Sequence, residues 1–346
     1  MVSLSNHDEV GASTRTRARS EWIVLLTLTA LVVIAAAASL LWGAGPSAAR
    51  TFLPALAKAD SKIVGVIFWE IRVPRTALAL MVGFTLGVTG AALQGFLRNP
   101  LAEPGLVGAS SGAALGAVAV FYFSLFGSGV IALPFGGAIG ALAALAILYG
   151  LSGSAPSVTT LILAGVAINA AAGALTSLLL NLAPNPFALY EVLFWLMGSV
   201  SDRGLEHVAL AAPFMIIGLT AIFMAARGLD ALTLGEDVAQ SLGVHMKRLR
   251  LAVIGGTGLA VGAGVAVTGI IGFVGLIVPH LVRPFVGHVP SKTLLPSGLA
   301  GAAMLTLADL LVRLLPGQEL KLGVVTALIG GPFFLMLILR RRSELT

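Results

Sequence analysis

The most enzyme-like pattern in this chain of 346 residues is Gly108-Ala109-Ser110-Ser111-Gly112, which matches the G-x-S-x-G motif of serine hydrolases. That motif needs a strand-to-helix turn and a histidine partner, whereas here it opens an apolar segment that predicts a helix. The five histidines lack the spacing of metal ligands, and no lysine follows the G-x-x-x-x-G of a phosphate-binding loop. The sequence therefore predicts no catalytic residue, no metal site, no cofactor and no ATP hydrolysis in this chain.

The composition is that of a membrane protein. Apolar residues make up 58% of the chain and charged residues 10%, there is no cysteine, and the mean hydropathy is +1.00. A single soluble core could not hide this much apolar surface. The net charge of +6 comes from basic residues scattered between apolar segments, so membrane topology explains it better than nucleic-acid binding. We predict an all-α polytopic membrane protein.

Apolar runs of about 20 residues, the length that crosses a bilayer, predict about ten transmembrane helices. We place them near residues 22–42, 73–96, 102–123, 131–150, 158–182, 207–226, 249–270, 273–287, 294–314 and 323–339. Residues 21–342 then form a single transmembrane domain, and residues 1–20 are predicted to be a disordered cytoplasmic tail. Ten is an even number, so both termini share one side, and the positive-inside rule places that side in the cytoplasm.

Two rows of glycines flank the polar block Arg98-Asn99-Pro100-Leu101-Ala102-Glu103-Pro104. A bilayer tolerates such a break only where protein or water meets the freed backbone groups. The rows Gly83/Gly87/Gly90 and Gly108/Gly112/Gly116 predict closely packed helices, either within the chain or at a dimer seam. Asp309 and Arg313 are four residues apart in the ninth predicted helix, and this spacing favours an ion pair over a proton relay.

A short helix is predicted in the loop of residues 227–248, which would be cytoplasmic. The segment Leu234–Gly243 is bounded by glycines and has Glu236 and Asp237 in its first turn, where negative charge is favourable. Val238 and Leu242 are four residues apart and share one face of this helix.

Longer patterns resemble one family. The string GAALQGFLRNPLAEPGLVGASSGAALG at 90–116, with Arg72-Val73-Pro74-Arg75 upstream, resembles the permease subunits of ABC importers for ferric siderophores, haem and vitamin B12. The resemblance continues in L-x-L-G-E-x-x-A-x-x-L-G-V at 232–244, in G-x-I-G-F-V-G-L-x-x-P-H-x-x-R at 269–283 and in residues 323–334, and it covers about residues 65–342. It implies the fold of a type II ABC importer permease.

The resemblance also implies roles for residues. Those expected to couple the permease to an ATPase are Gly235, Glu236, Ala239, Leu242 and Gly243. Those expected to dock a periplasmic binding protein are Arg72, Arg75 and Arg313. Those expected to form a cytoplasmic scaffold are Asn99, Pro100, Pro279, His280 and Arg283. Pro279 is expected to break or bend its helix.

The function implied by the resemblance is ATP-driven import across the bacterial inner membrane. The expected partners are a second copy of the chain, two ATP-binding cassette subunits that hold ATP and Mg²⁺, a periplasmic substrate-binding protein and the lipid bilayer, with no nucleic acid. The expected substrate is an iron chelate, either a ferric siderophore or haem, and cobalamin is the alternative. The predicted pathway segment 183–200 contains no Lys or Arg for haem propionates, which is weak evidence against haem. An ion-coupled secondary transporter is the alternative from another class; it would lack a coupling loop and bury more ionisable residues.

Overall fold

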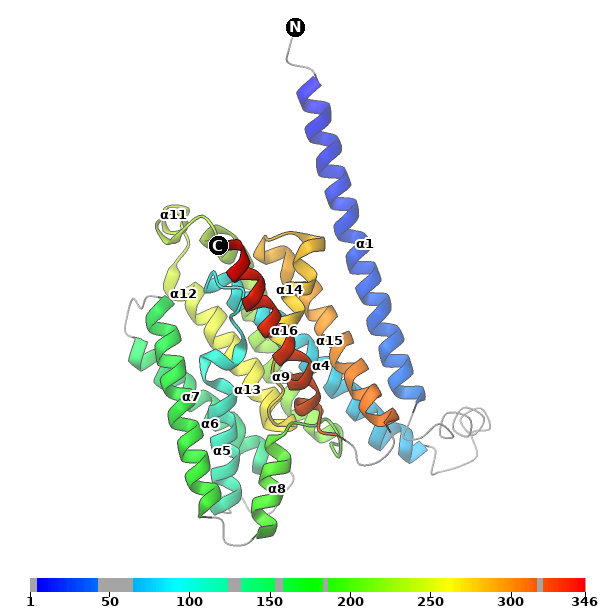
Figure 1. Cartoon of the computed structure of the whole chain (residues 1–346), viewed down its shortest axis with the longest axis vertical. Coiled ribbons are helices and arrows are strands. Elements are labelled where there is room, and N and C mark those ends of the chain that lie inside the picture. Colours follow the sequence, from blue (N-terminus) through cyan, green and yellow to red (C-terminus); the bar gives the residue numbers. More distant parts are fainter. Residues whose placement is uncertain are drawn as a thin grey trace.

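The computed structural model describes residues 5–42, 65–123, 132–152, 158–182, 186–315 and 320–345. All regular structure in these residues is helical, which confirms the predicted all-α class. Figure 1 shows one bundle with α1 along its side. The elements are α1 (Ser5–Leu41), η1 (Ile67–Arg72), α4 (Val73–Phe96), η2 (Pro104–Val107), α5 (Ala109–Phe123), α6 (Ala132–Ser152), α7 (Val158–Asn181), α8 (Pro186–Leu196), α9 (Leu205–Met224), α10 (Ala226–Leu232), α11 (Glu236–Ser241), α12 (Met246–Arg250), η3 (Leu251–Gly255), α13 (Gly256–Thr268), α14 (Val274–Val286), α15 (Pro290–Leu314) and α16 (Leu322–Leu345).

The described helices agree in position with the ten predicted spans. Seven of them are long and apolar enough to cross a membrane, and three shorter apolar helices lie at 109–123, 274–286 and 322–337. The shorter helices α5 and α14 are preceded by non-helical chain, at residues 97–103 and 269–273, which uses part of the length of each span. The short helix α8 was not predicted.

The N-terminal prediction is corrected by the structure. Residues 5–20, expected to be disordered, continue α1 as helix. Once an apolar helix has formed, adding further residues to its end is much easier than starting a new helix, and this segment contains no proline. Figure 1 shows the N-terminal end of α1, the C-terminal end of α16 and α11 at the same end of the bundle.

The glycine rows pack helices of the same chain together. A Cβ added at Gly87 of α4 would lie 2.7 Å from the carbonyl carbon of Ser297 in α15, and a Cβ at Gly112 of α5 would lie 2.6 Å from the carbonyl oxygen of Gly140 in α6. Backbones this close leave no room for side chains between them. Of the two alternatives that the sequence left open, the structure thus favours packing within the chain.

We expect Gly112→Leu to prevent α5 from packing on α6. The new side chain would need space that the backbone of Gly140 and the side chain of Ala144 occupy. Overpacking one buried site usually lowers the free energy of unfolding by about 1–3 kcal/mol, and we expect a larger loss here because backbone atoms are in the way. Folded yield and thermal unfolding in detergent measure the effect. Gly150→Leu, in α6 but with no atom within 4 Å of its added Cβ, is the matched control. Equal melting temperatures for Gly112→Leu and the wild type would contradict the packing account.

Candidate functional site

The end of the bundle opposite α11 contains a buried cluster of charges. Arg75 of α4 donates to Asp309 of α15 from Nε and Nη2, at 3.0 and 2.7 Å from Oδ1. Arg313 contacts the other carboxylate oxygen, with 2.9 Å between Nη2 and Oδ2. Asp309 is only 2% exposed. The predicted pair of Asp309 with Arg313 is confirmed, and Arg75 is a third member that the sequence did not reveal.

Two arginines of this region also bind the C-terminal end of α1. Arg72 donates from Nη1 to the carbonyl oxygens of Leu40 and Leu41, at 2.7 and 2.9 Å, and Arg313 donates to that of Ser39 at 3.1 Å. The last carbonyls of a helix lack partners within it and carry partial negative charge, so guanidinium groups stabilise them. We call Arg72, Arg75, Asp309 and Arg313 the arginine staple, because together they join α1, α4 and α15.

The three arginines of the staple are those predicted to dock a binding protein. Their side chains hydrogen-bond within the chain, and Arg72, Arg75 and Arg313 are only 5%, 8% and 7% exposed. Direct docking needs exposed guanidinium groups, so this burial favours a structural role. The docking role remains a prediction.

The predicted loop helix is present as α11, at the other end of the bundle. Gly235 precedes it with φ of 110° and Gly243 follows it with φ of 88°, a region of backbone conformation that favours glycine. Ala239 is fully buried, whereas Leu234 and Leu242 are 64% and 62% exposed. The helix is therefore anchored through Ala239, and the apolar side chains that flank it are uncovered.

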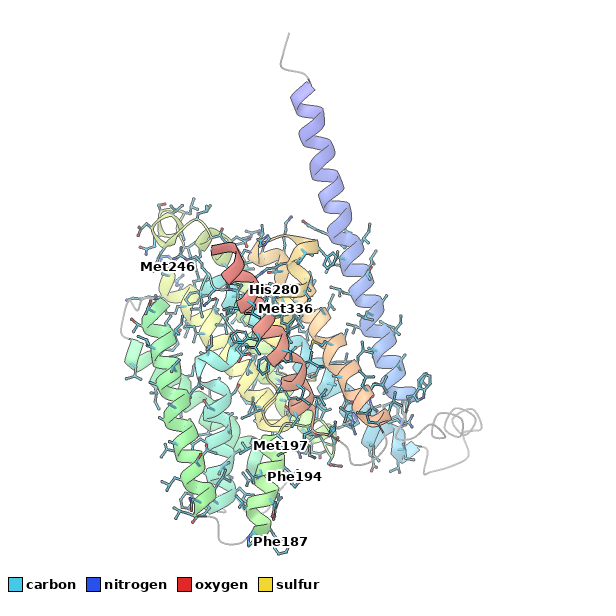
Figure 2. All side chains as sticks on the ribbon, viewed as in Figure 1. Phe187, Phe194, Met197, Met246, His280 and Met336 are labelled. Carbon is cyan, nitrogen blue, oxygen red and sulfur yellow. The ribbon has the colours of Figure 1, made fainter. Side chains whose placement is uncertain are left out.

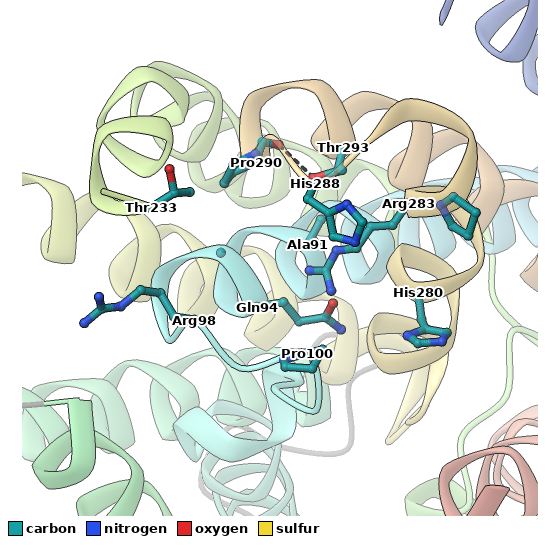
Figure 3. Close-up of a pocket in the computed structure, with 12 residues that line it drawn as sticks. Ala91, Gln94, Arg98, Pro100, Thr233, His280, Arg283, His288, Pro290 and Thr293 are labelled. Carbon is teal, nitrogen blue, oxygen red and sulfur yellow. Dashed lines mark hydrogen bonds between the residues drawn. The ribbon is translucent and has the colours of Figure 1, made fainter. Parts of the chain in front are cut away.

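Three of the five predicted scaffold residues meet at one pocket. Pro100, His280 and Arg283 line a cavity of about 610 Å³ together with Arg98 and residues of α4, α14 and α15 (Figure 3). The other two, Asn99 and Pro279, do not line the cavity but belong to the segments that form its walls. Asn99 accepts a hydrogen bond on Oδ1 from the backbone N–H of Leu101 at 3.0 Å, which fixes the turn after α4, and Pro279 is buried inside α14.

Of the two outcomes expected at Pro279, a break or a bend, the structure excludes the break, because α14 continues to Val286. Proline has no N–H, so the carbonyl of Gly275, four residues earlier, loses its helical donor. Gln94 of α4 replaces that donor, with its Nε2 3.2 Å from the carbonyl oxygen of Gly275. We did not single out Gln94 from the sequence, although a polar residue inside an apolar span is itself a signal.

We expect Gln94→Leu to destabilise the fold by about 1–3 kcal/mol, because it leaves the buried carbonyl of Gly275 without a donor. Adding Pro279→Ala should recover much of this loss, since the alanine N–H can restore the helical hydrogen bond. Thermal unfolding of the two variants and of Pro279→Ala alone measures the coupling. Strictly additive effects would show that Gln94 does not serve this carbonyl.

The two non-helical segments, residues 97–103 before α5 and residues 269–273 before α14, contact each other. Glu103, in the turn after α4, accepts a hydrogen bond from the backbone N–H of Phe273, which precedes α14. Phe273 has φ of 66°, an uncommon value for a residue with a side chain. The contact links the two non-helical segments that precede α5 and α14.

A helical bundle with these spans and an exposed loop helix at one end is the architecture of a polytopic α-helical membrane protein. A family model described as the FecCD transport family matches residues 31–340, and the chain belongs to that family. The hemin transport system permease protein of Yersinia pestis is 41% identical over 290 residues, which cover 80% of this chain and 84% of that one. The probable siderophore transport system permease protein YfiZ of Bacillus subtilis (strain 168) is 35% identical over 335 residues, which cover 95% and 99%.

A solved structure has the same fold. It is an inward-facing conformation of a putative metal-chelate type ABC transporter, with a TM-score of 0.79 and 34% sequence identity over 92% of this chain and 99% of that one. The resemblance seen in the sequence is confirmed: the chain is a permease of an ABC importer in the family that handles siderophores, haem or vitamin B12. The alternative of an ion-coupled secondary transporter is wrong.

Proposed function

We propose that this chain is the transmembrane subunit of an ATP-driven importer that carries an iron chelate, a ferric siderophore or haem, across the bacterial inner membrane. The observation that carries the proposal is α11. It is short, held between two glycines with positive φ and anchored by Ala239, and the exposed side chains of Leu234 and Leu242 flank it. Such a helix suits a groove of a partner subunit, because burying exposed apolar side chains against a partner lowers the free energy of the complex.

The partners follow from this assignment. We infer a homodimer with two ATP-binding cassette subunits against α11, which bind ATP and Mg²⁺, and a periplasmic substrate-binding protein at the opposite end. Both termini would then be cytoplasmic, because the N-terminal end of α1 and the C-terminal end of α16 lie at the same end as α11 (Figure 1). This chain itself would carry out translocation and gating without making or breaking covalent bonds.

The pathway is proposed to include residues 186–200 of the predicted segment, the part that the structure describes. These residues contain α8, which ends far from α11 and exposes Phe187 and Phe194 (Figure 2). No Lys or Arg lies in this stretch. An apolar, aromatic lining would favour a chelate whose charge is already neutralised by its metal over free anionic groups.

The names of the relatives span several substrates, cobalamin included, and iron chelates are among them. One relative is a hemin permease, another is a probable siderophore permease, and the solved neighbour is a putative metal-chelate transporter. Cobalamin remains the alternative within the family. Buried Asp309, which would be the natural candidate for ion coupling, is instead paired with Arg75 and Arg313.

Reconstitution tests the substrate directly. The permease, its ATPase and its binding protein would be placed in liposomes, and ATP hydrolysis would be measured with haem, several ferric siderophores and cobalamin. Stimulation by one iron chelate supports the proposal. Stimulation by cobalamin alone would show that the substrate is cobalamin and would leave the assignment as an ATP-driven importer intact. Uptake without the ATPase would overturn the proposed function.

A further inference from the structure

The pocket lined by Arg98, His280, Arg283 and His288 has no part in the function proposed above. Its lining residues, all within the described part of the chain, include two arginines and two histidines but no carboxylate. Its volume of about 610 Å³ lies within the range typical of ligand sites. A cavity lined by basic side chains without a counter-ion has a positive potential, and an anion bound there would lower its electrostatic cost.

The arginines of the pocket have no ion pair among the described residues. The nearby carboxylate of Asp230 is not part of the lining and accepts a hydrogen bond from the backbone N–H of Ser291 at 2.8 Å. Lys292, just beyond it, pairs with Glu21. Arg283 extends into the space shared with His288, while Arg98 lies at the far rim (Figure 3).

Gln94 supplies the second observation. It is 2% exposed, and its amide nitrogen donates to the carbonyl oxygens of Gly275 and Leu276, at 3.2 and 3.3 Å. These two acceptors fix which end of the amide is nitrogen, because a swapped amide would set oxygen against oxygen. The remaining oxygen, Oε1, has no hydrogen-bond partner among the described residues and is turned toward Arg283 in Figure 3.

We propose that this pocket binds a phosphate group that also presents a hydroxyl. Arg283 and His288 would hold the anionic oxygens, Arg98 would add positive charge at the rim, and Oε1 of Gln94 would accept a hydrogen bond from the hydroxyl. Hydrogen phosphate has this chemistry, and so does the headgroup of phosphatidylglycerol, whose glycerol carries hydroxyls. Arginine is well suited to phosphate because its donors are arranged as a planar fork. The proposal does not depend on which substrate the importer carries.

The test uses the full chain in nanodiscs. In discs of phosphatidylcholine, binding of radiolabelled inorganic phosphate is measured by equilibrium dialysis, with sulfate as a competitor that carries no proton near neutral pH. In a second arm, thermal stabilisation by phosphatidylglycerol is compared with that by phosphatidylmethanol, which has the same charge but no hydroxyl. Binding in the first arm identifies the free anion as the ligand, and selective stabilisation in the second identifies the lipid.

Two variants separate the roles of the pocket residues. Arg283→Gln should weaken binding about tenfold or more, whereas Arg248→Gln, an exposed arginine on α12 outside the pocket, should leave it unchanged. The double variant Gln94→Met with Pro279→Ala keeps the carbonyl of Gly275 bonded but removes Oε1. It should still bind anions and lose the preference for the hydroxyl-bearing ligand.

Three results would overturn the proposal. The first is equal binding of phosphate and sulfate together with equal stabilisation by the two lipids. The second is an affinity that Arg283→Gln does not change. The third is the absence of binding in both arms combined with poorer ATPase assembly in Arg283→Gln, which would make the pocket a contact for a carboxylate of the ATPase.

Discussion

Replacing Asp309 with Asn is expected to destabilise the folded permease by about 3–5 kcal/mol, the usual cost of removing one partner from a buried ion pair. The carboxylate compensates Arg75 and Arg313, both buried, so its loss leaves two guanidinium groups with little counter-charge. The loss should appear as low folded yield and a lower melting temperature in detergent. Since α1, α4 and α15 meet here, the contact of the C-terminal end of α1 with α4 and α15 should loosen first.

A triple variant provides the control for this prediction. Arg75→Met, Asp309→Leu and Arg313→Met together remove the charges, and much of the stability should return because buried ion pairs can be replaced by apolar residues at little cost. Wild-type melting in Asp309→Asn would contradict the account. The folded triple variant also tests docking: unchanged affinity for the binding protein would show that Arg75 and Arg313 are not docking residues.

Replacing Ala239 with Trp is expected to reduce ATP-driven uptake by about tenfold or more while the permease still folds and inserts. Ala239 lies on the buried face of α11 and is fully buried, so a large side chain there must displace the helix from its position. Glu236→Arg should act at the same place by reversing a charge in the first turn, at a cost to the helix itself of only about 0.3–1 kcal/mol.

The measurement compares assembly, ATP hydrolysis and uptake in the reconstituted importer. We expect either loss of the ATPase from the complex or hydrolysis that no longer drives uptake. Gln240→Arg, an exposed change in the same helix away from Ala239, is the matched control. Normal uptake with an intact ATPase complex in both Ala239→Trp and Glu236→Arg would show that coupling takes place elsewhere.

The spans and the loop helix were predictable because their causes are local in sequence. An apolar run long enough to cross a bilayer predicts a helix wherever it packs. Likewise α11 follows from its flanking glycines and from Glu236 and Asp237 in its first turn. The family strings were also visible in the sequence, and so was the pair of Asp309 with Arg313, since residues four apart on a helix are neighbours.

Only the tertiary structure could show which distant residues complete each site. Arg75 is 234 positions from Asp309, and Gln94 is 181 positions from the carbonyl of Gly275. The glycine rows predict close packing but do not say on which helix. Hydropathy and helix-end rules describe one segment at a time, whereas these contacts depend on which helices the bundle places side by side. The tertiary structure therefore decided that the outer arginines are buried in a staple and that Gln94 compensates for Pro279.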